Sequence, residues 1–123
     1  MSRIAHTAYV DNINESALCN SNYRQVSHTG KFCQSVYMSL EPGEDIPTEV
    51  HDVEQIIVVI SGKADVDVNG EEFSLDQFGD MIIIPVNTRH YIKNGGNQTL
   101  KLWSIYTPKE HPMGRKDINQ PLK

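Results

Sequence analysis

The Asn69-Gly70 pair is the feature that most restricts what this chain can fold into. It separates two short segments, ADVDV and EEFSL, in which apolar and polar residues alternate. Alternation is typical of a strand with one buried face, and Asn-Gly favours the two-residue hairpin turn in which both central residues need positive φ. The pattern predicts an antiparallel hairpin with an apolar inner face. That face comprises Ala64, Val66, Val68, Phe73 and Leu75.

Short β-branched segments separated by turn residues recur along the rest of the chain, whereas helical periodicity is hard to find. The segments KFCQSVYMSL, QIIVVISG, DMIIIP and TLKLWSIY each have the composition of a strand. The first twenty or so residues are rich in Asn and Ser and favour a leading strand plus loop. About six to eight antiparallel strands suit either a sandwich or a small jelly-roll barrel, so the sequence predicts an all-β fold with both architectures open.

The length of 123 residues predicts a single domain with one core and room for one pocket. We expect the core to span about residues 30–107. The N-terminal segment 1–29 and the proline-containing tail 108–123 should pack on this core or on a partner.

Charge and hydropathy exclude several classes of partner. The formal net charge is −5 and no run of Lys or Arg occurs, which argues against nucleic acid as a partner. The longest apolar run, Ile56 to Ile60, is too short to span a bilayer, and the first residues lack an apolar leader, so we expect a cytoplasmic protein with no membrane partner. Cys19 and Cys33 lack C-x-x-C spacing and are expected to be reduced thiols.

Four polar residues precede or begin expected strands. Glu49 and His51 are two apart and would leave the same face of a strand, and the polar DVE that follows would turn the chain so that Gln55 opens the next strand. His90 follows a proline-marked turn. Two imidazoles, a carboxylate and an amide oxygen suit Fe, Mn, Co, Ni or Zn and leave positions open for water or substrate. The spacing predicts one divalent metal ion; ordinary surface or core side chains are the alternative, since E-x-H also occurs by chance.

From Gly43 to Asn94 the sequence resembles the cupin superfamily, whose two motifs are G-x5-H-x-H-x(3,4)-E-x6-G and G-x5-P-x-G-x2-H-x3-N. The positions that match the first motif in spacing are Gly43, Glu49, His51, Gln55 and Gly62. Those that match the second are Gly79, Pro85, Asn87, His90 and Asn94. The resemblance implies a jelly-roll β-barrel, a double-stranded β-helix, with a metal site on Glu49, His51, Gln55 and His90.

Three residues depart from the motifs. Glu49 stands where the first histidine is usual and Gln55 where the glutamate is usual, so the set has two histidines and keeps one anionic ligand. With glutamate and glutamine exchanged, it resembles the zinc site of cupin-fold mannose-6-phosphate isomerases. Asn87 replaces a glycine and tolerates the left-handed conformation. The flanking segments also resemble small stand-alone cupins often labelled mannose-6-phosphate isomerase-like; these segments are NYRQVSHTGKFCQSVYMSLEPG, EVHDVEQ and YTPKEHP.

Other residues are weaker candidates. For a substrate pocket we consider Gln34, Met38, Trp103 and Tyr106. Gln34 shares strand parity with Met38 and would point into the barrel, or lie at the surface as a strand-end residue; Trp103 and Tyr106 would stack on a sugar-like ligand or belong to the core.

The remaining polar candidates are expected to be structural or solvated. Asp52 and Glu54 are able to accept a hydrogen bond from a ligating imidazole, or are simply solvated turn residues. His6, His28 and His111 are expected in solvated loops.

We therefore expect a divalent-metal-binding cupin acting on a small polar ligand, sugar-like or carbonyl, with isomerase or epimerase chemistry. An Fe-dependent dioxygenase and a non-catalytic ligand-binding or sensor module are the alternatives, the latter because no general base stands out beyond the ligands. The expected strands QIIVVI and MIIIP are apolar on both faces, so the face of each that points away from the barrel core must also be covered. We expect a homodimer to cover it; the alternative is a monomer in which residues 1–23 do so.

Overall fold

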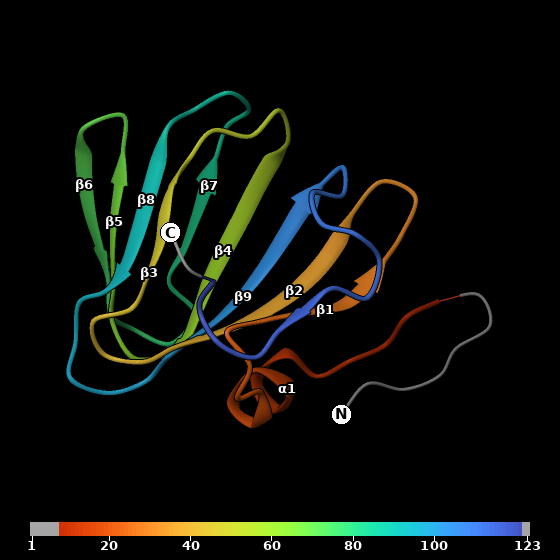
Figure 1. Cartoon of the computed structure of the whole chain (residues 1–123), viewed down its shortest axis with the longest axis horizontal. Helices are drawn as coiled ribbons and strands as arrows, with labels where there is room; N and C mark the ends of the chain where they lie inside the picture. Colours follow the sequence, from red (N-terminus) through yellow and green to blue (C-terminus); the bar gives the residue numbers. More distant parts are fainter. Residues whose placement is uncertain (1–7, 122–123) are drawn as a thin grey trace.

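The computed structural model describes residues 8–121, which form two antiparallel sheets and one short helix (Figure 1). The elements in chain order are α1 (Ile13–Cys19), β1 (Arg24–Thr29), β2 (Gln34–Leu40), β3 (Asp45–Glu49), β4 (Glu54–Ser61), β5 (Ala64–Val68), β6 (Glu71–Leu75), β7 (Met81–Ile84), β8 (His90–Asn94), β9 (Leu100–Thr107) and β10 (Lys116–Asp117). The larger sheet has the order β10-β1-β2-β9-β4-β7 and the smaller β3-β8-β5-β6. From β2 to β9 every connection except the β5-β6 hairpin crosses between the sheets, which confirms the all-β jelly-roll prediction.

The core lies between the inner faces of the two sheets. Every second residue of β9 is buried, as expected for a strand with one face in a core. Opposite it, the smaller sheet contributes Ile46, Val66 and Ile92, all at most 4% exposed. Each buried aliphatic side chain stabilises the fold by about 1.5–3 kcal/mol, so this apolar interior supplies the main driving force for folding.

The predicted hairpin is present. β5 and β6 pair from Ala64↔Leu75 to Val68↔Glu71, and the turn residues Asn69 and Gly70 have φ of 51° and 87°. Phe73, however, is 38% exposed rather than fully inward. It pairs with the buried Val66, but β6 is an edge strand, so one side of the ring has no neighbouring strand to cover it.

Helix α1 replaces the expected leading strand and loop. Asn12 caps it by accepting a hydrogen bond from the Glu15 backbone N–H at 2.8 Å, and Ala17 packs on Tyr37 and Ile60 of the larger sheet. The helix has only 7 residues and one fully buried side chain, so its sequence carries almost no helical period. α1 therefore covers part of the outer face of the larger sheet, while Met81 and Ile83 on β7 remain half exposed.

The C-terminal tail lies on this chain's own barrel (Figure 1). The Gln34 carboxamide donates to the His111 carbonyl (2.8 Å) and accepts from the backbone N–H groups of Glu110 (3.2 Å) and His111 (2.9 Å). Further along, β10 pairs with β1, and Asp117 forms ion pairs with Arg24 and Arg115. These contacts close the tail over one end of the barrel.

Within residues 8–121, no helix has both the length and the apolar character needed to cross a bilayer.

Two glycines with similar backbone conformations should respond differently to substitution. Gly62 and Gly70 have φ of 94° and 87°, but a Cβ on Gly62 would lie 2.8 Å from the Thr99 carbonyl oxygen, whereas Gly70 faces open space. We expect Gly70→Ala to lower the free energy of unfolding by about 1 kcal/mol, from the left-handed conformation alone. Gly62→Ala should cost about 3 kcal/mol or more, because backbone must shift. Urea unfolding measures both losses; equal losses would contradict the close approach of the Thr99 backbone to Gly62.

Candidate metal centre

Strand pairing brings the predicted ligands to one end of the barrel. Glu49 at the end of β3 is the register partner of His90 at the start of β8, and paired residues project from the same face. His51 lies in the turn before β4, where its carbonyl accepts a 2.6 Å hydrogen bond from the Asn87 backbone N–H. Asn87 has φ of 56°, the left-handed conformation expected at this position. One ligand atom each from Glu49, His51 and His90 lies within 4.8 Å of the others, as the sequence predicted.

His90 has a defined tautomer. Its Nδ1 lies 2.9 Å from the Thr88 carbonyl oxygen, which can only accept, so Nδ1 carries the proton. The lone pair of Nε2 is therefore free. This nitrogen is buried and has no hydrogen-bond partner among the described residues.

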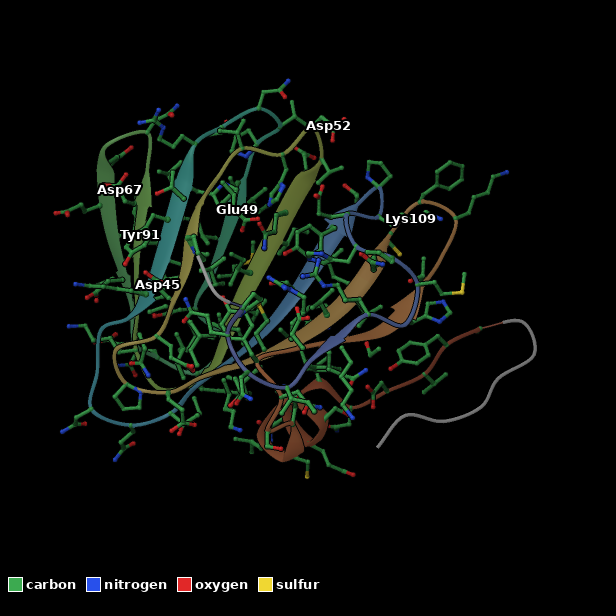
Figure 2. The ribbon with its side chains drawn as sticks, in the orientation of Figure 1. Asp45, Glu49, Asp52, Asp67, Tyr91 and Lys109 are labelled. Atoms are coloured by element: carbon green, nitrogen blue, oxygen red, sulfur yellow. The ribbon has the colours of Figure 1, made fainter. Side chains whose placement is uncertain are left out.

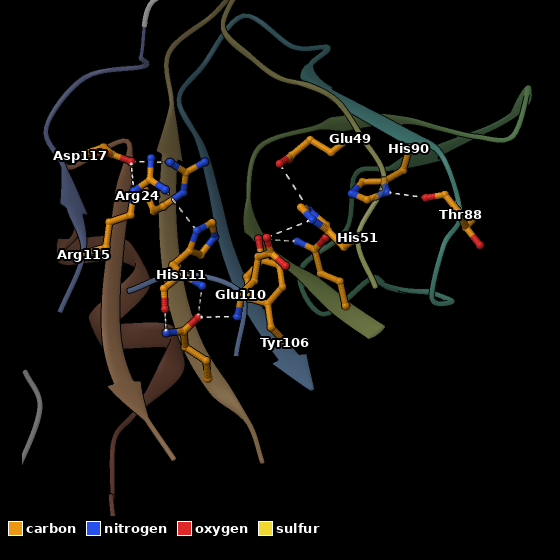
Figure 3. Close-up of polar contacts among 12 residues, drawn as sticks. Arg24, Glu49, His51, Thr88, His90, Tyr106, Glu110, His111, Arg115 and Asp117 are labelled. Atoms are coloured by element: carbon orange, nitrogen blue, oxygen red, sulfur yellow. Dashed lines mark hydrogen bonds and ion pairs between the residues drawn. The ribbon is translucent and has the colours of Figure 1, made fainter. Parts of the chain in front are cut away.

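His51 lies between two carboxylates (Figure 3). Its Nε2 is 3.4 Å from Glu49 Oε2 and its Nδ1 is 3.3 Å from Glu110 Oε2. Hydrogen bonding to Glu49 is the largest effect on the pKa of His51 and raises it above the usual value, although burial opposes the rise. Burial acts to raise the pKa of Glu49, but the hydrogen bond and charge of His51 outweigh it and lower that pKa. Without a metal, the pair therefore favours a carboxylate beside an imidazolium.

Gln55 is oriented by Tyr106. The two are register partners on β4 and β9, and the Gln55 amide N–H donates to the Tyr106 hydroxyl at 2.9 Å. Burial raises the pKa of Tyr106, which keeps the hydroxyl protonated. This contact fixes the amide so that Gln55 Oε1 remains buried and, within the part of the chain that the structure describes, without a hydrogen bond.

These atoms together fit a cation. His90 Nε2 and Gln55 Oε1 are buried and lack hydrogen-bond partners within residues 8–121. His51 Nε2 has only a long contact of 3.4 Å with Glu49 Oε2. An unsatisfied buried polar group costs about 1–3 kcal/mol. A divalent ion would satisfy the imidazole nitrogens together and neutralise Glu49, so the donor set has the chemistry of a transition-metal site.

The four residues predicted for a substrate pocket lie in different parts of the structure. Tyr106 lies beside the cluster, with its ring centroid 6.0 Å from that of His51. Met38 is part of the apolar core, and both amide atoms of Gln34 are bonded to the tail. Trp103 is on the outer face of the larger sheet, beside Tyr37, where its indole N–H donates to Ser35 Oγ at 2.9 Å. It therefore faces α1 and not the metal centre.

The expectation for His111 was wrong. Its side chain is 7% exposed rather than solvated, and its ring is nearly perpendicular to the Tyr106 ring, with 5.0 Å between the ring centroids. Burial and the neighbouring Arg24 and Arg115 guanidinium groups lower the pKa of His111 to about 4. The cause of the error is distance along the chain, since its partner Gln34 is 77 residues away.

Among the other polar side chains, His28 differs from expectation, whereas the two carboxylates that precede Gln55 match the solvated alternative. His28 lies on strand β1, stacked on Tyr9 at 4.5 Å, rather than in a loop, and His6 is outside the described residues. Asp52 and Glu54 are exposed, and Figure 2 shows Asp52 at the turn, apart from Glu49. Glu110 instead contacts His51. The signal that could have indicated Glu110 and His111 is the YTPKEHP segment, which contains both.

A cavity of about 370 Å³ opens beside the metal centre. The residues that line it are Tyr23, Arg24, Pro47, Glu49, Glu110, His111, Arg115 and Pro121. A somewhat larger hollow of about 440 Å³ lies on the outer face of the smaller sheet, around Asp65, Asp67 and Tyr91. We assign the ligand site to the first cavity because it contains Glu49, and we call it the mouth cavity.

Comparison with known proteins identifies a family, two sequence relatives and a similar crystal structure. Residues 36–106 match the family model described as a cupin domain. The uncharacterized protein L612 of Acanthamoeba polyphaga mimivirus is 40% identical over 118 residues, covering 92% of this chain and 73% of L612. The uncharacterized protein YrkC of Bacillus subtilis is 38% identical over 112 residues, covering 86% of this chain and 60% of YrkC. The crystal structure of BH2720 from Bacillus halodurans superposes with a TM-score of 0.90 at 30% identity, covering 97% of this chain and 95% of that one.

Acidification should test the environment of His111. The folded chain holds this imidazole neutral down to about pH 4, whereas the unfolded chain binds a proton below about 6.5, so stability is lost as the pH falls between these values. Between pH 7 and 4.5 we expect His111→Phe to lose about 2 kcal/mol less than the wild type in urea unfolding of metal-free protein. Equal losses in wild type and His111→Phe would contradict the burial of His111.

Proposed function

Because this chain belongs to the cupin domain family, we propose that it is a metal-dependent enzyme acting on a small polar substrate in the mouth cavity. Glu49, His51, Gln55 and His90 would hold one divalent ion. When bound, the ion would act as a Lewis acid toward a carbonyl or hydroxyl oxygen.

The observation that carries the proposal is the group of buried, unsatisfied ligand atoms. His90 Nε2 and Gln55 Oε1 have no hydrogen-bond partner in the described chain, and His51 Nε2 has only its 3.4 Å contact with Glu49, although each atom is enclosed by protein. A folded protein rarely tolerates several such atoms in one place. The convergence of His51 and His90 with Glu49 is most simply explained by an ion that these three residues bind together.

The surrounding residues prepare these atoms. The Thr88 carbonyl keeps the His90 proton on Nδ1. Glu110 lies where its carboxylate can accept a hydrogen bond from His51 Nδ1–H, so Nε2 of each ring is left as the ligand atom. Because the Gln55 amide nitrogen donates to the Tyr106 hydroxyl, the amide oxygen of Gln55 points away from that hydroxyl. Tyr106 is also placed to limit water at the back of the site, because it is only 3% exposed.

We favour isomerase or epimerase chemistry on a carbonyl or sugar-like substrate. Such reactions need a proton acceptor besides the metal ligands, and Glu110 supplies a carboxylate that lines the mouth cavity without belonging to the ligand set. A second candidate is an Fe-dependent dioxygenase, because two histidines with one carboxylate are typical of non-haem iron oxygenases. The bound metal separates the two: zinc or manganese supports the first and redox-active iron the second.

Elemental analysis of protein purified without added metal tests the site. We expect about one transition ion per wild-type chain and none in the His51→Ala/His90→Ala double variant, whose circular dichroism should stay that of a β-protein because the apolar core supplies most of the stability. His28→Ala, on the exposed side of β1, is the matched control and should retain the ion. Unchanged metal content in the double variant would place the site elsewhere.

Glu110 should strengthen metal binding through His51. We expect Glu110→Gln to weaken metal affinity about ten-fold in a competition titration with a coloured chelator, because the imidazole loses the carboxylate at its Nδ1. Asp52→Asn removes an equal charge one residue from His51, but its side chain is exposed and should leave the affinity unchanged. If both variants weaken binding equally, the effect is general electrostatics and not orientation of His51.

Assembly is a further part of the proposal. The half-exposed Met81 and Ile83 lie on β7, an edge strand of the larger sheet, where a second copy could cover them. We therefore retain the homodimer as a proposal.

A further inference from the structure

The mouth cavity contains two buried hydrogen-bond donors that have no acceptor. Arg24 and His111 are each 7% exposed, and both line this cavity. Arg24 Nε and His111 Nε2 are buried and lack hydrogen-bond partners within residues 8–121. Neither belongs to the metal-ligand set, so the proposed metal does not explain them.

The neighbours of His111 fix which of its nitrogens carries the proton. Arg115 Nη1 lies 3.5 Å from His111 Nδ1, and a guanidinium group can only donate, so Nδ1 is the acceptor. The neutral ring must then carry its proton on Nε2. The low pKa of His111, caused by burial and by Arg24 and Arg115, keeps the ring neutral near pH 7. His111 therefore presents an N–H, as Arg24 does.

Both donors are held in place before any ligand arrives. Gln34 hydrogen-bonds to both the N–H and the carbonyl of His111, and the Tyr106 ring packs nearly perpendicular to the His111 ring. Arg24 is held by its ion pair with Asp117 (Figure 3). Donors that are already fixed bind an acceptor without a further loss of side-chain entropy.

The charge at this end of the cavity favours an anion. Arg24 and Arg115 share the single carboxylate of Asp117, which leaves one positive charge in excess. The two carboxylates that line the cavity, Glu49 and Glu110, face His51, where a divalent ion would balance them. A monoanion at the Arg24 end would then neutralise the site.

We propose that the mouth cavity binds the carboxylate group of a small 2-hydroxy or 2-oxo acid through Arg24 Nε–H and His111 Nε2–H. The inference rests on the proposed metal function, because the second oxygen of the acid would face the metal centre. A carboxylate accepts charge-assisted hydrogen bonds from both donors, which a neutral amide or alcohol does only weakly. A volume of about 370 Å³ suits an acid of this size rather than a polymer.

Calorimetry on the metal-loaded full chain tests this, with lactate as the probe and lactamide as its neutral counterpart. We expect lactate to bind about ten-fold or more tightly than lactamide. Arg24→Gln and His111→Phe should each weaken lactate binding about ten-fold while metal content is unchanged. Lys109→Gln removes an exposed cation from the same tail and should bind lactate normally (Figure 2).

Two results would overturn the inference. If lactate affinity is the same in both variants as in the wild type, the acid is held by the metal alone. If lactamide binds as well as lactate, the site does not recognise charge. Should Arg24→Gln fail to fold, Arg24→Lys keeps a cation beside Asp117 but lacks the guanidinium donor, and it should still weaken lactate binding.

A failure of the metal proposal can be told apart. If elemental analysis finds no metal, the carboxylate site is tested on the metal-free chain with acetate, following the NMR signals of Arg24 Nε and the His111 ring. A shift of the His111 ring signals that is lost in Arg24→Gln, and a shift of the Arg24 Nε signal that is lost in His111→Phe, would support the site by itself. Their absence at saturating acetate would overturn it.

Discussion

The interior of the barrel changes from apolar to polar at one row of side chains, and the arrangement of the site depends on how that row is satisfied. Gln34, Tyr106 and Gln55 are register partners on the adjacent strands β2, β9 and β4, and all are at most 3% exposed. A buried polar group that lacks a partner costs about 1–3 kcal/mol, so the row must find acceptors and donors inside the protein. Gln55 uses Tyr106, and Gln34 uses the backbone of the tail.

The hydrogen bonds between Gln34 and the tail backbone determine which side chains lie nearby. By binding residues 110 and 111 of the backbone, Gln34 brings the Glu110 carboxylate to His51 and the His111 ring to Arg24. The hydrogen bond from Gln55 to Tyr106 leaves the Gln55 amide oxygen buried and without a partner among the described residues. The same row thus separates the hydrophobic core, which holds the fold together, from the mouth cavity, where charged groups are concentrated. Stability and function occupy neighbouring layers of one barrel.

Sequence reasoning succeeded where the determining contacts are short-range. The Asn69-Gly70 turn, the alternation of the strands and the spacing of Glu49 and His51 are all local features, and each reappears in the structure. It failed where a residue is defined by a distant partner or a short element. His111 depends on Gln34, and α1 is too short to show a period. Trp103 was a different kind of error: it lies an odd number of positions from Tyr106, so a strand must send the two to opposite faces.

The central place of β9 in the larger sheet has a consequence for when this protein can fold. β9 is the last long strand of the chain, yet it lies between β2 and β4, which have no direct pairing with each other in the described sheet. A nascent chain therefore exposes the inner edges of both earlier strands until residues 100–107 have been synthesised. Closure of the sheet must wait until β9 is available, and its long-range pairings place folding among the slower β topologies. During that interval the growing polypeptide presents open strand edges to its surroundings, and chaperone binding would be most useful then.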